Sequence, residues 1–375
     1  MVRIEEGGTA TALVCGASGV VGFAAAREFT AAGWNVIGLS RRVPPRFNNT
    51  EHPASKHVAV DLADLESVWA AAPQFGEVTH VVFAALYEKP GLVRGWFEQD
   101  QMDRNLAMIS NLFTVLDEVA DIQHVTLLQG TKAYGPHVEP MKVPGRERNP
   151  RHDHANFYWL QEDYLRARQE AGHPSTFTIV RPQVIYGEAQ GGNMNITPAL
   201  GVYAALLRAS GQPLHWPGGV PSISEAVDAD LLGRMLVWAA TAESSANETF
   251  NFTNGDVYSL QNCWPTIADA FGMDVGDDQP MALADAMPRK QDEWVALVDR
   301  FDLTAPKSLD EFVGQSFIYA DLMTGVGRTE LRPPSLVSTV KLRQAGFTEC
   351  LDTEDMFGQQ IAAMQAANLF PPRHW

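Results

Sequence analysis

The chain has 375 residues, enough for two domains or one enlarged α/β domain, and 45% of them are hydrophobic, which argues against disorder. Its 28 Lys and Arg residues against 45 Asp and Glu residues give a net charge of −17, which excludes a protein that binds the nucleic-acid backbone or an anionic membrane surface. The three cysteines show no disulfide or metal spacing, residues 1–6 are acidic rather than apolar, and no run approaches the roughly 20 apolar residues of a membrane span. We therefore expect a cytoplasmic protein.

A glycine-rich turn near the start organises the chain. The apolar run 12–15 predicts a buried strand, and a helical pattern follows the turn. Gly16 allows the turn, Gly19 lets the backbone approach a pyrophosphate, and Gly22 lets strand and helix pack closely. The free N–H groups at the start of the helix favour phosphate binding. This arrangement predicts a dinucleotide site; the alternative is a glycine-rich turn without a ligand.

The end of the second predicted strand, 35–40, bears on coenzyme choice. The strand ends in Ser40 and is followed by Arg41 and Arg42, with no Asp or Glu nearby. An acidic residue here binds the ribose 2′-hydroxyl of NAD, whereas an arginine accommodates the 2′-phosphate of NADP. We therefore expect NADPH/NADP as the cofactor; the alternative is a pair of solvated surface arginines.

Further predicted strands at 57–60, 79–85, 124–128 and 177–180 alternate with helical patterns at 65–72, 103–119 and from 156 onward. This alternation predicts an α/β fold with a Rossmann-type doubly wound parallel sheet, in which ligands bind beyond the C-terminal ends of the strands. The expected cofactor contacts therefore lie in the turn or at strand ends: Gly16, Ser18, Gly19, Val20, Gly22, Ser40, Arg41, Arg42, Asp61, Leu62, Ala84, Gln129, Pro182, Val184 and Ile185.

The second half of the chain predicts a smaller, mostly helical C-terminal cap that binds substrate. A helical pattern spans 198–210, and the region 264–375 is rich in Met, Trp, Phe and Leu, which line apolar pockets but also fill ordinary cores. We expect residues 1–187 to form the NADP-binding Rossmann domain, with a returning segment near 215–260. Residues 188–375 would form the cap, interleaved with the first domain.

Two stretches carry the candidate chemistry: 129–136 directly after a strand, and 156–163 at the start of a helix. Lys132 could hold ribose hydroxyls and depress the pKa of a neighbouring phenol such as Tyr158. Taken alone, the first is a surface lysine and the second a core aromatic residue. His152 and His154 have no third ligand at an evident spacing, so we expect no metal site.

Several motifs resemble one known family: Gly130-Thr131-Lys132, Asn156-Phe157-Tyr158 with Gln161-Glu162-Asp163, and Asn247-Glu248-Thr249-Phe250-Asn251 with Asn254-Gly255-Asp256. Over nearly its whole length the chain resembles the progesterone 5β-reductase/iridoid synthase-like enzymes, a branch of the extended short-chain dehydrogenase/reductases. The resemblance implies NADPH-dependent reduction of enones or enals, with hydride going to the β-carbon. The enolate would be held by a tyrosine and a lysine, here Lys132.

The resemblance also implies a small apolar carbonyl substrate and a possible homodimer. We expect the substrate contacts to include Leu86, His137 and Asn195. The nucleotide-sugar epimerases are disfavoured, because Asp163 stands where the lysine of their YxxxK motif would lie.

The chain departs from the family at the catalytic phenol, which falls on Trp159, while Tyr158 matches the preceding tyrosine. Neighbours on a helix point about 100° apart, and an indole N–H donates a hydrogen bond but is no proton acid near neutral pH. Three readings stay open. Enone reduction survives, with Trp159, Tyr158 or water meeting the oxyanion. The site performs carbonyl reduction or a non-redox elimination or aldol-type reaction. The protein binds NADP(H) without turnover.

Overall fold

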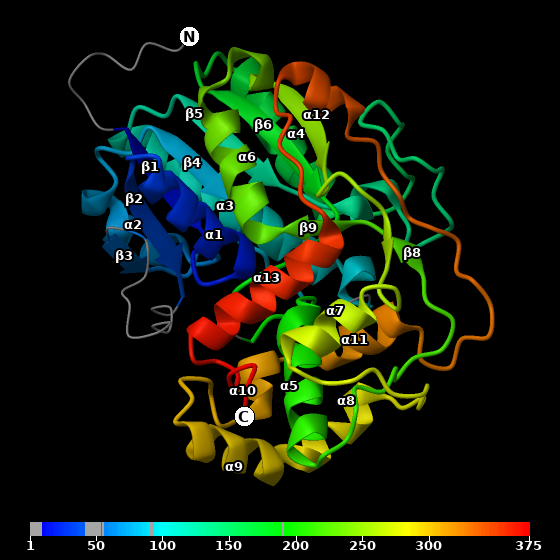
Figure 1. Ribbon diagram of the computed structural model, residues 1–375. Helices are drawn as coiled ribbons and strands as arrows, with labels where there is room; N and C mark the ends of the chain where they lie inside the picture. The colour runs from blue at the N-terminus through cyan, green and yellow to red at the C-terminus, as the bar shows by residue number, and fades with distance from the viewer. Residues whose placement is uncertain (1–9, 42–53, 55, 90–93, 190) are drawn as a thin grey trace.

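The computed structural model describes residues 10–41, 54, 56–89, 94–189 and 191–375 (Figure 1). Within them the central sheet has seven parallel strands in the order β10-β6-β5-β4-β1-β2-β3. The strands are β1 Thr11–Cys15, β2 Asn35–Ser40, β3 Lys56–Ala59, β4 His80–Phe83, β5 His124–Leu128, β6 Thr176–Pro182 and β10 Glu248–Phe252. The strand order reverses between β1 and β4, which is where doubly wound sheets bind ligands.

Helices cover both faces of the sheet, so its central strands β1 and β4 are buried along their whole length. The first face carries α1 Val20–Ala31 and α6 Ala229–Thr241, which bury their apolar sides against β1 and β10. The second face carries α2 Leu65–Ala71, α3 Gln99–Val119 and α4 Phe157–Glu170. The short helix α12 Val340–Ala345 packs beside β10. The predicted Rossmann-type doubly wound fold is therefore confirmed.

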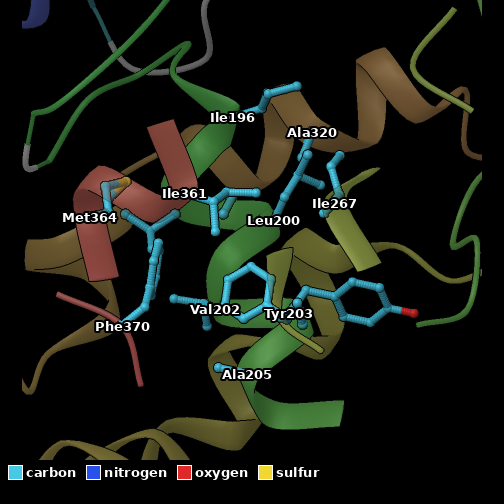
Figure 2. Packing of buried hydrophobic residues seen from close by; sticks show 14 of the residues in the cluster. Ile196, Leu200, Val202, Tyr203, Ala205, Ile267, Ala320, Ile361, Met364 and Phe370 are labelled. Atoms are coloured by element: carbon cyan, nitrogen blue, oxygen red, sulfur yellow. The ribbon is translucent and has the colours of Figure 1, made fainter. Parts of the chain in front are cut away.

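A second, helical part lies below the sheet in Figure 1 and has its own core. It consists of α5 Ile196–Ala209, α7 Trp264–Ala270, α8 Leu283–Ala286, α9 Gln291–Phe301, α10 Leu309–Val313, α11 Ser316–Thr324 and α13 Thr353–Ala366. Figure 2 shows Leu200 of α5 close to Ile361 of α13, with Ile267 of α7 and Ala320 of α11 beside it. None of the helices in the described ranges is both long and apolar enough to cross a membrane.

Short strand pairs and 3₁₀ turns complete the described fold. The strand pairs are β7 Val184–Tyr186 with β9 Ala226–Asp228, and β8 Ile223–Ser224 with β11 Tyr258–Ser259. Single 3₁₀ turns are η1 Ala72–Gln74, η2 Arg94–Phe97, η3 Thr131–Tyr134, η4 Glu243–Ser245 and η5 Pro288–Lys290. After α5 the chain returns to the sheet with α6 and β10, and it returns again with α12. The domain boundary near residue 187 stays a prediction.

The predicted and observed element bounds differ where sequence signals are weak. The strands at 35–40 and 124–128 agree, whereas β3 begins and ends one residue earlier than predicted. Helix α3 begins at Gln99 rather than Asp103, because its first turn is polar and lacks apolar periodicity. Helix α5 begins at Ile196 rather than Pro198, since a proline is tolerated in the first turn, where N–H groups have no partner in the helix.

Candidate functional site

The glycine turn between β1 and α1 is as tight as the sequence predicts. Gly16 has φ +85°, and a Cβ there would lie 2.9 Å from the carbonyl oxygen of Ala84. A Cβ at Gly22 would collide with the carbonyl oxygen of Gly16, so glycine is required at both positions. Gly19 is the N-cap of α1 and supplies no side-chain cap, which leaves the start of the helix to another hydrogen-bond acceptor. This cradle fits the pyrophosphate of a dinucleotide.

The neighbouring strand ends provide polar groups on either side of the turn. Ser40 Oγ lies 2.8 Å from His57 Nε2, and Arg41 follows on the exposed surface. Arg42 lies outside the described residues. Asp61 follows β3, accepts a hydrogen bond from the Ala63 N–H at 3.0 Å, and keeps its carboxylate partly exposed. Ser40, Arg41 and Asp61 thus lie at neighbouring strand ends, and their contact with a cofactor stays a prediction.

The other expected cofactor residues lie at the ends of β4, β3 and β6. Ala84 continues β4 through a hydrogen bond from its N–H to the Cys15 carbonyl. Leu62 is buried after β3. Pro182 ends β6, and the next strand, β7, contains Val184 and Ile185. The helix start adds Ser18 and Val20, next to Gly19.

Gln129 belongs to a buried polar network between β5, β6 and α4. Its Oε1 accepts a hydrogen bond from Arg181 Nε at 2.8 Å, and its Nε2 donates to the Tyr158 carbonyl at 3.0 Å. Glu162 accepts from Arg181 as well, at 3.3 Å. Because the Gln129 side chain is engaged by protein groups at both ends and its N–H donates to the Val180 carbonyl at 2.8 Å, any cofactor contact would fall to its backbone carbonyl.

Lys132 lies in η3, directly after β5, and forms a half-buried ion pair. Its Nζ is 2.9 Å from Glu88 Oε1 and 4.2 Å from the centre of the Trp96 ring. The Trp96 indole N–H donates to the same Glu88 oxygen at 2.7 Å. The Glu88 side chain is 3% exposed. Burial lowers the pKa of Lys132 from its ordinary value, and the Glu88 carboxylate opposes that effect.

Sequence reasoning missed Glu88. It lies 44 residues before Lys132 and belongs to no recognised motif. The available signal was its position: Glu88 follows β4 within five residues, at the sheet edge where ligands bind.

Tyr158 lies in the first turn of α4. Asn156 caps this helix by accepting a hydrogen bond from the Tyr158 N–H at 3.0 Å, and its amide donates to the Lys132 carbonyl, so the helix start is tied to η3. The Tyr158 ring packs 5.1 Å from Trp96, and its hydroxyl lies above Gly130, 3.2 Å from where a Cβ would be. Burial, with a smaller contribution from Glu88, raises the pKa of Tyr158, so its phenol stays protonated.

Trp159 faces different groups. Its ring packs against two guanidinium groups, 4.8 Å from that of Arg151 and 5.2 Å from that of Arg181. Its Nε1 is buried and has no hydrogen-bond partner within the described residues. The two neighbouring aromatic residues thus diverge as their helical spacing predicts.

The three expected substrate residues differ in their surroundings. Leu86 is exposed after β4. His137 packs against Trp96, and both its ring nitrogens are buried without a partner among the described residues. Burial, then His154 and Lys132, lowers the pKa of His137 to about 4, so its ring is neutral at pH 7. Asn195 donates to the Gly187 carbonyl at 2.6 Å, which occupies its amide group.

His152, His154 and His137 form a chain of neighbouring rings. The ring centroids of His137 and His154 are 5.0 Å apart. In the described part of the chain, no three His, Cys, Asp or Glu side chains are arranged to hold a metal ion.

A comparison with known families agrees with this fold and with the glycine turn. A sequence profile of the NAD dependent epimerase/dehydratase family matches residues 12–252, from β1 to the end of β10. The chain belongs to this family.

Named relatives cover almost the whole chain. An (S)-8-oxocitronellyl enol synthase of Nepeta cataria is 28% identical over 380 residues, which are 96% of this chain and 91% of the relative. A 3-oxo-Delta(4,5)-steroid 5-beta-reductase of Arabidopsis thaliana is 28% identical over 380 residues, 96% and 93% of the two chains. These relatives confirm the resemblance found in the sequence motifs, and the chain is an NAD(P)-dependent oxidoreductase.

Solved structures agree in fold. The UDP-glucose 4-epimerase of Thermus thermophilus in complex with NAD has a TM-score of 0.64 at 17% identity, covering 95% of this chain and 99% of that one. An epimerase described from Burkholderia cenocepacia has a TM-score of 0.63 at 21% identity, with 96% and 98% covered. At such identities the likeness concerns the fold alone.

Proposed function

We propose that this chain is an NADPH-dependent reductase of α,β-unsaturated carbonyl compounds. The observation that carries the proposal is that Lys132 and Tyr158 both pack against Trp96: the Lys132 Nζ lies 4.2 Å from the centre of its ring, and the Tyr158 ring centroid lies 5.1 Å from it. Lys132 follows β5 at the sheet edge that holds the glycine turn. The names of the relatives support it, because one is a 5-beta-reductase of 3-oxo-Delta(4,5)-steroids.

The chain's own residues would act on the substrate oxygen. The Tyr158 phenol, kept protonated by burial, would donate a hydrogen bond where negative charge develops, and the Lys132 ammonium would supply positive charge beside it. When bound, NADPH supplies the hydride that adds to the β-carbon. The side chains clustered around Trp96 are aromatic or apolar, which favours a small apolar carbonyl substrate.

The cofactor would be held by the turn and the strand ends described above. Gly16, Gly19 and Gly22 would shape the pyrophosphate cradle, and Arg41 with Arg42 would meet the 2′-phosphate. This phosphate contact is the basis of the proposed preference for NADPH. A cytoplasmic location is proposed as well: Cys15, Cys263 and Cys350 are free thiols, as a reducing compartment allows.

The test is oxidation of NADPH with a panel of small enones and enals, followed at 340 nm (a property of the reduced nicotinamide). We expect turnover of at least one conjugated carbonyl compound, and a loss of about a hundredfold or more in kcat in Lys132→Met. Tight NADPH binding with a silent panel would contradict the proposal and favour either another reaction or a protein that binds NADP(H) without turnover.

A further inference from the structure

Glu88 is a buried acid that none of the sequence motifs explains. Its carboxylate accepts hydrogen bonds from two groups at one oxygen, the Lys132 ammonium at 2.9 Å and the Trp96 indole at 2.7 Å. Burying an acid and a base together costs desolvation energy that their attraction offsets only with good geometry and added hydrogen bonds. Such a pair is therefore weak support for stability, and its place beside Tyr158 points to function.

We propose that Glu88 is a positioning residue of this centre, which holds the Lys132 ammonium beside the Trp96 ring and keeps it cationic. Its catalytic meaning rests on the proposed function, because the charge on Lys132 matters for turnover only if that lysine stabilises a developing oxyanion. The pairing itself can be tested without any substrate.

The backbone on both sides of Glu88 is fixed to α3. The preceding residue, Tyr87, donates its N–H to Asn105 Oδ1 at 2.9 Å and accepts from Asn105 Nδ2 at 2.7 Å. The following residue, Lys89, donates its N–H to Gln101 Oε1 at 2.9 Å. Asn105 and Gln101 are both fully buried, so Glu88 is presented from a rigid support.

Other titratable groups face the pair from the surrounding elements. His137, in the loop after η3, is neutral at pH 7 because burial lowers its pKa to about 4. Tyr158 of α4 and Tyr319 of α11 both feel the Glu88 charge, and burial is the main reason that the pKa of each is raised. At neutral pH these three groups are uncharged, whereas the Glu88 carboxylate forms an ion pair with the Lys132 ammonium at 2.9 Å.

Replacing Glu88 by glutamine keeps its shape and removes its charge. The burial of Lys132 would then be unopposed, and we expect its pKa to fall by about one unit or more. In turnover we expect a loss of about tenfold or more in kcat, with KM changed less, and an alkaline limb of the pH profile that moves to lower pH. A role confined to stability would leave that limb unmoved.

The experiment is an NMR titration of the full chain carrying ¹³C-labelled lysine, with the Lys132 signal assigned from Lys132→Met. We expect Glu88→Gln to lower the pKa of Lys132, and Glu88→Asp to give an intermediate value because the charge is kept but withdrawn by one methylene. The matched control is Glu98→Gln, which removes an acid that pairs with Lys89 rather than Lys132. It should leave the Lys132 signal in place.

An unchanged Lys132 pKa in folded Glu88→Gln would overturn the inference. If that variant does not fold, an unchanged Lys132 pKa in Glu88→Asp would do the same. The titration needs no substrate. A silent enone panel together with a shifted Lys132 would therefore contradict the proposed function while keeping the pairing, and an active enzyme with an unshifted Lys132 would do the reverse.

Discussion

Tyr158 and Trp159 are adjacent in the chain but pack against different groups. Tyr158 packs against Trp96 and Gly130, whereas the ring of Trp159 packs against the guanidinium groups of Arg151 and Arg181. If the chain performs the proposed reduction, this difference favours Tyr158 over Trp159 as the residue that takes the role of the family's catalytic tyrosine. In this chain the phenol that packs against Trp96, the ring that Lys132 also contacts, belongs to the preceding residue of the motif.

Matched substitutions at these two positions separate their roles. Tyr158→Phe removes the hydroxyl that we expect to meet the oxyanion, so kcat should fall about a hundredfold to a thousandfold. Trp159→Phe keeps an aromatic ring against the two arginines, and kcat should stay within a few-fold of the parent. The measurement is steady-state turnover of an active enone by both variants. The opposite ranking would assign the oxyanion to the Trp159 indole.

Substitution of Arg41 and Arg42 tests the proposed preference for NADPH over NADH. If Arg41 and Arg42 bind the 2′-phosphate, replacing both by alanine should weaken NADPH binding by about tenfold or more and leave NADH binding nearly unchanged. The dissociation constants can be measured by nicotinamide fluorescence titration. Equal losses of affinity for NADPH and NADH would show that the arginines do not bind the 2′-phosphate.

The sequence predicted the position of a single residue in the fold where that residue directly follows a strand. Lys132 follows β5, and the structure brings it to the sheet edge as expected. Glu88 was missed because its role depends on partners that only the fold brings near. The same dependence explains Gln129 and Asn195, whose amides bond to Arg181 and Gly187 of the protein itself.

At the scale of elements, the close packing of α1 against α6 supports the glycine turn. Gly233 of α6 lies against α1: a Cβ there would be 2.7 Å from Glu28 Cγ and 3.0 Å from the Ala24 carbonyl oxygen. The absence of a side chain therefore lets the two helices approach each other on the face that carries the turn.

Gly233→Ala should separate these helices. The added methyl group overpacks the contact, and we expect the free energy of unfolding to fall by about 1–3 kcal/mol. Urea denaturation provides the measurement. Gly76→Ala is the control, because a Cβ at Gly76 would make only an ordinary contact, 3.7 Å from the Val119 carbonyl oxygen. Equal stability of the two variants would refute the packing argument.

The strands of the sheet and the first cap helix, α5, were predicted from the sequence, and the later helices of the cap were not. Apolar runs closed by turns marked β2 and β5, since strands buried on both faces are continuously apolar. In the cap, helices as short as α8 and α10 are defined by a shared core rather than by their own periodicity. The sequence could predict their class and not their bounds.

At the scale of the whole molecule, two buried histidines are expected to make the free energy of unfolding fall at acidic pH. His80 and His124 lie on neighbouring strands, and burial lowers their pKa values to about 4 and about 3. In the unfolded chain both would titrate near pH 6.5. The unfolded state therefore binds protons first, so stability is fully present above about pH 6.5 and is lost as the pH falls toward the folded pKa values.

We expect Tm to fall between pH 7 and pH 4. The two histidines each contribute on the order of 1 kcal/mol per pH unit in that range. His124→Gln should reduce the slope of stability against pH, as measured by thermal unfolding at a series of pH values. His173→Gln, at a partly exposed histidine, is the control. A slope identical in parent and His124→Gln would exclude this histidine as a source of acid sensitivity.

The central claim, reduction of a conjugated C=C bond, is tested most directly by following the transferred hydrogen. NADPH deuterated at nicotinamide C4, in both stereochemical forms, is turned over with an active enone, and the product is examined by NMR. The account predicts deuterium on the β-carbon with the carbonyl group retained. Deuterium on the former carbonyl carbon, or a product that carries none, would contradict it.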